Sequence, residues 1–95
     1  GSYTGNGSDT ERTITLGFQP RFLIVKNAEQ GTNWEVLDTT RGWGSGNDKR
    51  IWLDLDQAQT DGDDIGAPTS TGFTLNTDSN THNSNNKTYI YYAHA

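Results

Sequence analysis

Hydrophobic and polar positions alternate with a period of two in several short stretches of the chain. In 12–16, Ile14 and Leu16 alternate with threonines, and the same alternation returns in 33–38 and 49–55. A period of two is typical of β-strands that turn one face toward a core. These stretches are therefore predicted to be strands.

The alternation also predicts which side chains share a face. In 33–38, Trp34 and Val36 lie on one face, and Trp34 is expected in the core, while Glu35 and Leu37 share the other face. In 49–55, one face is apolar and predicted to be core, and the other is mixed; the apolar face carries Ile51, Leu53 and Leu55, and the mixed face carries Arg50, Trp52 and Asp54.

The most continuously apolar run is 21–27, which follows the turn Gly17-Phe18-Gln19-Pro20. Its residues are β-branched or aromatic and have no helical spacing, which favours a strand buried on both faces. We expect the rest of the chain to pack around this strand.

Glycine and asparagine mark the connections. Asn6-Gly7 predicts a tight turn that joins 3–4 to 12–16 as a hairpin. Three glycines surround Trp43 in 39–48, which predicts a surface loop that exposes a large ring. Residues 56–70 have no periodicity and are predicted to be a loop, whereas 72–75 and 88–95 are expected to be strands.

Short strands separated by turn signals, without a helical period, predict the fold class. We expect an all-β fold, an antiparallel, jelly-roll-like β-sandwich of about seven to eight strands with long polar loops, in a single domain over residues 1–95. Gly1-Ser2 is compatible with a remnant of cloning. The chain has no cysteine, so neither disulfides nor thiolate metal sites hold the fold.

Charge narrows the range of partners. Seven Lys and Arg side chains and a net charge of −5 argue against binding nucleic acid or an anionic membrane surface, because both need clustered cations. No apolar run approaches the roughly 18 residues of a membrane span, and no N-terminal signal is visible. We therefore expect neither nucleic-acid binding nor membrane insertion.

The sequence contains little that indicates a metal site or a catalytic site. His82 and His94 are not paired with another ligand at metal-binding spacing. The aspartates of 54–64 do not follow the spacing of an EF-hand loop, so no metal or cofactor is expected, although calcium binding by the acidic segment 56–64 stays open. No Gly-x-Ser-x-Gly motif occurs, and an enzyme is not expected.

Six segments, taken in order, resemble a β-sandwich domain of tail-fibre and other virion proteins of bacteriophages, including marine ones; they are Tyr3-Thr4-Gly5-Asn6-Gly7, Gly17-Phe18-Gln19-Pro20, Ile24-Val25-Lys26-Asn27, Asp38-Thr39-Thr40-Arg41-Gly42, Ser70-Thr71-Gly72-Phe73-Thr74-Leu75 and Tyr89-Ile90-Tyr91-Tyr92-Ala93. The resemblance implies a module for host-surface attachment or fibre architecture, and it carries no catalytic motif. Ala28 stands where that domain often has arginine, and the last strand has tyrosines where tryptophan is frequent.

The candidate ligand residues are aromatic rings beside polar groups, because sugars stack their C–H faces on rings and bind polar groups through hydroxyls. They are Trp43, Trp52, Arg50, Asp54 and Arg41. The alternative for both tryptophans is that they cover the edge of a small core. Arg41 is expected to pair with Asp38 and shape the loop, with contact to an acidic glycan as the alternative.

The function hypothesis is a non-catalytic virion module, made in the host cytoplasm, that binds host-surface carbohydrate. Its partner would be a bacterial surface glycan, and copies of the chain would be held together in a fibre, as in a trimer. The alternative is a purely structural oligomerisation or spacer module without a ligand.

Overall fold

The computed structural model describes residues 1–95 and confirms the predicted all-β, antiparallel sandwich. Its elements are β1 (Ser2–Thr4), β2 (Arg12–Thr15), β3 (Phe22–Asn27), β4 (Glu35–Asp38), the 3-10 turn η1 (Thr39–Arg41), β5 (Asp48–Trp52), β6 (Thr60–Asp63), β7 (Pro68–Thr69), β8 (Gly72–Leu75) and β9 (Thr88–His94).

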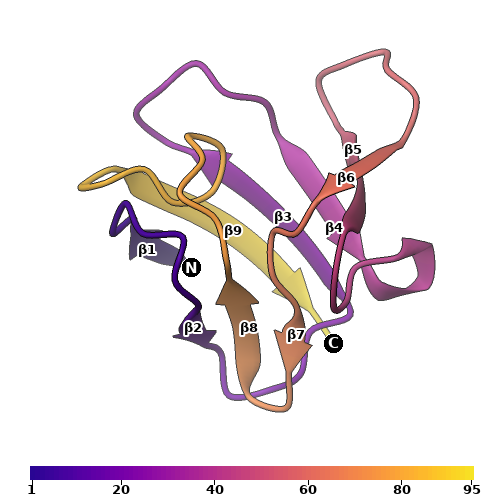
Figure 1. Ribbon diagram of the computed structural model, residues 1–95, viewed down its shortest axis with the longest axis horizontal. Coiled ribbons are helices and arrows are strands. Elements are labelled where there is room, and N and C mark those ends of the chain that lie inside the picture. Colours follow the sequence, from indigo (N-terminus) through magenta and orange to yellow (C-terminus); the bar gives the residue numbers. More distant parts are fainter.

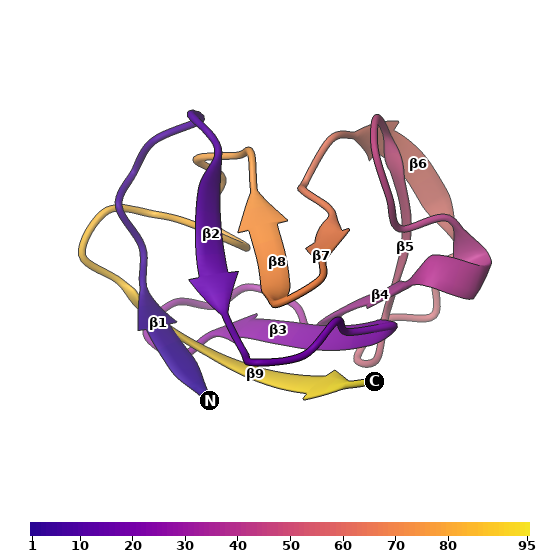
Figure 2. The same ribbon diagram turned by 90° about the horizontal axis from the view of Figure 1, so that it is seen from below.

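The strands form two sheets of unequal size. The large sheet has six strands in the order β1-β9-β3-β4-β5-β6, and the small sheet has three in the order β2-β8-β7. Figure 1 shows the small sheet in front of the large one. Figure 2 shows that the strands of the small sheet run across β3 and β9, while β5 and β6 rise at its side.

The core lies between the two sheets and is rich in aromatic rings. Phe73 of β8 is fully buried, and its ring meets the rings of Tyr3, Trp43 and Tyr91 edge-on, at centroid distances of 6.3, 6.4 and 5.7 Å. The Tyr3 ring stacks on that of Tyr89 at 5.1 Å. Large rings thus provide much of the burial in a chain that is poor in apolar residues.

Strand β3 has a central place in the large sheet, between β9 and β4, but the prediction that both of its faces are buried is wrong. Leu23, Val25 and Asn27 point inward and are at most 1% exposed. Phe22, Ile24 and Lys26 are only half-buried, since no layer of the chain covers the outer side of the large sheet.

The predicted hairpin between 3–4 and 12–16 is also wrong, because β1 pairs with β9 and β2 pairs with β8. The glycines between them dock on the loop before β9 instead. The amide N–H groups of Gly5 and Gly7 donate to the carbonyls of Lys87 and Asn83. A Cβ atom on Gly5 would lie 2.0 Å from the carbonyl oxygen of Ser84, so only glycine allows this close approach.

Two further expectations fail around β5. The strand ends at Trp52, and the predicted core residues Leu53 and Leu55 are 62% and 40% exposed. The chain turns at residues 53–54, where the carboxylate of Asp54 accepts from the N–H of Trp34. The segment 56–70 is not a continuous loop, since its residues 60–63 add β6 to the exposed edge of β5 and 68–69 form β7.

Candidate functional site

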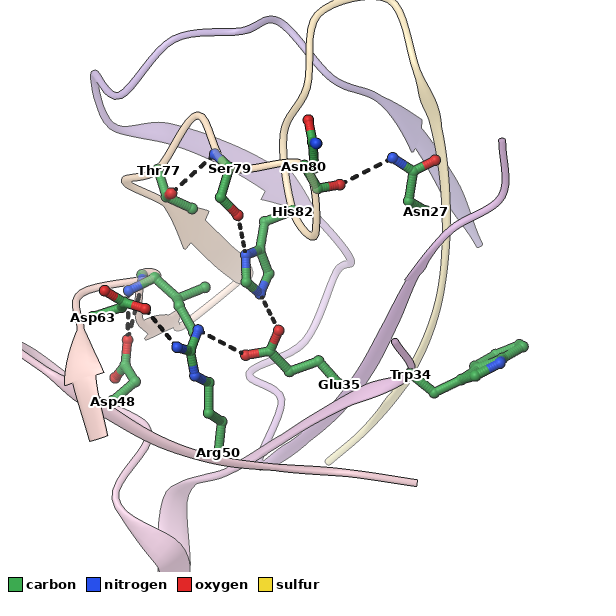
Figure 3. A network of polar contacts seen from close by, with 12 residues as sticks. Asn27, Trp34, Glu35, Asp48, Arg50, Asp63, Thr77, Ser79, Asn80 and His82 are labelled. Atoms are coloured by element: carbon green, nitrogen blue, oxygen red, sulfur yellow. Dashed lines mark hydrogen bonds and ion pairs between the residues drawn. The ribbon is translucent and has the colours of Figure 1, made fainter. Parts of the chain in front are cut away.

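A chain of polar contacts crosses the interior beside the hydrophobic core, and Glu35 is at its centre (Figure 3). Glu35 lies on the inner face of β4 and is fully buried. Its Oε1 atom is 3.3 Å from Nη1 of Arg50, and its Oε2 atom is 2.9 Å from Nε2 of His82. A buried carboxylate needs such partners, because burial removes the water that would otherwise solvate it.

Strand register brings Arg50 and Trp52 to this carboxylate. Trp52 lies directly opposite Glu35 in the β4–β5 pair, so Arg50, two residues earlier, is a diagonal neighbour on the same face. The Arg50 guanidinium lies 5.6 Å from the centroid of the half-buried Trp52 ring. Its Nη2 atom binds Oδ2 of Asp63 on the adjacent strand β6. Arg50 thus connects a buried acid, an exposed acid and an aromatic ring.

A polar cavity of about 200 Å³ opens next to Arg50. Nine of its ten lining residues are polar: Asp9, Arg50, Asp63, Asp64, Asn76, Thr77, Asp78, Ser79 and His82, with Ile65 as the tenth. Oδ1 of Asn76 is buried there without a hydrogen-bond partner in the protein. The cavity therefore offers carboxylates, amides, hydroxyls and one guanidinium to a small polar ligand.

The turn that closes this cavity is built from short local hydrogen bonds. The N–H of Ser79 donates to Oγ1 of Thr77, and Oγ of Ser79 lies 3.0 Å from Nδ1 of His82. The N–H groups of His82 and Asn83 both donate to the carbonyl of Ser79. The Asn- and Ser-rich segment before β9 is thus folded into a defined wall.

Asp48 fixes the other wall. Its buried carboxylate accepts from the N–H groups of Gly44, Ile65 and Gly66 at 2.9, 2.8 and 3.2 Å. Burial raises the pKa of Asp48, although these hydrogen bonds act in the opposite direction. The carboxylate holds the residues before β7 against β5.

Trp43 is a core residue, as in the alternative that the sequence left open, and it does not belong to an exposed binding surface. The residue is 3% exposed and its ring packs against Phe73. The N–H of Trp43 donates to the carbonyl of Asp38, and Gly42, with a φ of 119°, turns the chain so that the ring enters the core. Trp34 was expected in the core, and this prediction is wrong, because the residue is 39% exposed.

The remaining predicted residues are separated from one another. Arg41 donates to Oε1 of Gln59, and the expected pair with Asp38 does not form, since the Asp38 carboxylate caps η1 by accepting from the N–H of Thr40. Asp54 accepts from the N–H of Trp34 in the turn after β5. Of the five candidates, the structure brings only Arg50 and Trp52 into contact, and only Arg50 lines the cavity.

Sequence reasoning missed most of the cavity. Glu35 gave one signal, a charged residue that alternates with Leu37 on one strand face. His82, Asn76 and Ser79 gave none, because they lie in a polar segment without periodicity. No group of three or more His, Asp or Glu side chains is arranged to hold a metal ion, and no helix has the length and apolar character to cross a membrane.

The chain belongs to the family described as Domain of unknown function (DUF7483), which it matches over residues 1–95. No curated protein and no solved structure matches it significantly.

Proposed function

We propose that this chain is a non-catalytic module of a phage tail fibre or related virion protein, and that its polar cavity binds carbohydrate of the bacterial surface. The observation that carries the proposal is a small cavity with nine polar lining residues, which bring carboxylates, hydroxyls, an amide and a guanidinium together. Such groups suit a sugar, because its hydroxyls can donate hydrogen bonds to carboxylates and amide oxygens and accept them from a guanidinium.

The charge of the cavity selects among sugars. Four carboxylates line it, those of Asp9, Asp63, Asp64 and Asp78, against the single guanidinium of Arg50. Arg50 is already paired with Glu35 and Asp63. An acidic sugar would meet repulsion there, so the ligand class is a neutral or amino sugar.

The size of the cavity limits how much ligand it holds. Its volume of about 200 Å³ is below the roughly 300–1,000 Å³ of sites for drug-sized ligands. The cavity therefore suits about one sugar residue. Single-site affinity should be weak, in the micromolar to millimolar range, and adhesion would depend on several copies.

The test is a glycan array with the chain displayed multivalently, followed by titration of the best neutral or amino sugar. Asp78→Ala and Asn76→Leu should lose binding at least tenfold. Asp61→Ala is the matched control, because Asp61 is an exposed aspartate of β6 outside the cavity lining, and it should bind normally. Melting temperatures establish that each variant is folded.

Two results would overturn the proposal. One is a parent chain that binds no bacterial polysaccharide even when displayed in many copies. The other is unchanged sugar affinity in both the Asp78→Ala variant and the Asn76→Leu variant, each of them folded. That result would show that the sugar does not bind in the cavity.

A further inference from the structure

The outer face of the large sheet carries an apolar row across four strands. Tyr92 of β9 lies opposite Ile24 of β3, Ile24 lies opposite Val36 of β4, and Val36 lies opposite Ile51 of β5. Because alternate residues of a strand point to opposite faces, this row points away from the core that Leu23, Val25 and Leu37 form. No other layer of the chain covers it.

Large apolar side chains are exposed around this row. Leu53, Tyr92, Trp34 and Ile90 are 62%, 57%, 39% and 39% exposed. They border a groove of about 210 Å³ in which every lining residue is hydrophobic: Ile24, Trp34, Leu53, Ile90, Tyr91 and Tyr92. Its aromatic rings could stack on a sugar, but no polar residue lines the groove to replace the water partners of the sugar hydroxyls, so the groove does not suit a glycan.

Polar side chains flank the apolar row on both sides, two residues away along the strands. On one side, His94 and Asp38 lie opposite Phe22. On the other side, Lys26 lies opposite Ile90, and its Nζ donates to the carbonyls of Asn27 and Gln30. An apolar centre with a polar rim is the usual anatomy of a protein–protein interface.

The exposed apolar area matches what a pair of copies needs. With roughly 200 Å² for a fully exposed large side chain, the four exposed fractions amount to roughly 400 Å². A standard interface buries about 800 Å² on each partner, a little over half of it apolar. The exposed side chains of the outer face therefore provide about as much apolar area as one partner contributes to a standard interface.

We propose that this outer face is the interface between two copies of the chain, packed sheet against sheet about a twofold axis. An isologous interface uses the same patch twice, so the patch must be self-complementary. This face offers both parts, the protruding Leu53 and Tyr92 side chains and the groove beside them. Sheets that pack face to face interdigitate such side chains at a spacing of about 10 Å.

The experiment is sedimentation equilibrium or light scattering on the 95-residue chain between about 5 and 500 µM. The parent should show the mass of a dimer at the upper concentrations. The double variant Leu53→Lys/Tyr92→Lys should weaken dimerisation at least tenfold. The matched control is Thr13→Lys/Thr15→Lys, which adds the same charge at exposed positions of β2 in the small sheet, and it should dimerise like the parent.

Because the four substituted residues are exposed, all variants should melt cooperatively, and a melting curve checks this. A parent chain that stays monomeric at 500 µM would overturn the proposal, and so would a folded Leu53→Lys/Tyr92→Lys variant that still dimerises. The outcome is independent of sugar binding, since the cavity variant Asp78→Ala should leave the mass unchanged.

Discussion

At the scale of single residues, the surroundings of the tryptophan rings decide their roles. Trp43 is 3% exposed between the sheets, and its Nε1–H has no partner there. Trp34 is 39% exposed on the outer side of the large sheet. A buried ring contributes to stability through the surface it removes from water, even when one polar atom is left unpaired. Trp43 is therefore a core residue, and Trp34 belongs to the outer face.

Trp43→Ala should destabilise the fold by about 3–5 kcal/mol, because it leaves a large cavity beside Phe73. For a domain of this size such a loss lowers Tm by more than about 10 °C. Trp34→Ala is the control and should cost less than half as much. Thermal denaturation measures both, and equal losses from the two variants would contradict this assignment of the rings.

At the scale of elements, β3 shows how one strand serves two surfaces. Its inward residues Leu23 and Val25 are each 1% exposed and belong to the core cluster. Ile24 points outward and lines the apolar groove. The same strand therefore anchors the sandwich on one side and forms part of the proposed interface on the other.

Val25→Asp should prevent folding, since it places a carboxylate without a partner in the core at a cost of several kcal/mol. Ile24→Asp should remain folded with a loss of roughly 1 kcal/mol, because the new carboxylate reaches solvent, and it should weaken dimerisation. Urea denaturation followed by circular dichroism distinguishes the two variants. A folded Val25→Asp protein or an unfolded Ile24→Asp protein would show that the faces of β3 are assigned incorrectly.

At the scale of the whole molecule, the Asp48 side chain connects the large sheet to the segment that leads into the small sheet. Its carboxylate on β5 of the large sheet accepts from Ile65 and Gly66, which precede β7 of the small sheet. Asn at this position keeps one acceptor oxygen and turns its amide group toward these N–H donors. Asp48→Asn should thus cost about 1–3 kcal/mol at pH 7.

The difference in stability between the parent and Asp48→Asn should depend on pH, and the pKa shift of Asp48 determines the sign of this dependence. Burial raises the pKa of Asp48 in the folded chain above its unfolded value of about 3.9. The folded state therefore binds the proton more tightly, and the stability that Asp48 contributes falls as pH rises between the two pKa values and is constant above them. The advantage of the parent over Asp48→Asn should be larger at pH 3 than at pH 7. Urea titrations at both values measure it, and an advantage that grows with pH would show the opposite shift.

The sequence by itself determined the short-range features of this protein. The period-two pattern placed β2, β4 and β5, because side-chain alternation is a local property of extended backbone. A continuous apolar run placed β3, and strand propensity placed β8 and β9. The period-two pattern also paired Glu35 with Leu37 on one face of β4. Composition and the absence of a helical period predicted the sandwich correctly.

Only the tertiary structure decided which face of each strand is buried and which strands are neighbours. Alternation relates Trp34 to Val36, but the position of the second sheet determines that their face is the outer one. Strand β1 joins β9 rather than β2 because the Gly5–Gly7 backbone bonds to a loop distant in sequence. The cavity likewise combines Asp9, Arg50 and His82, and their meeting depends on long-range packing that no local pattern encodes.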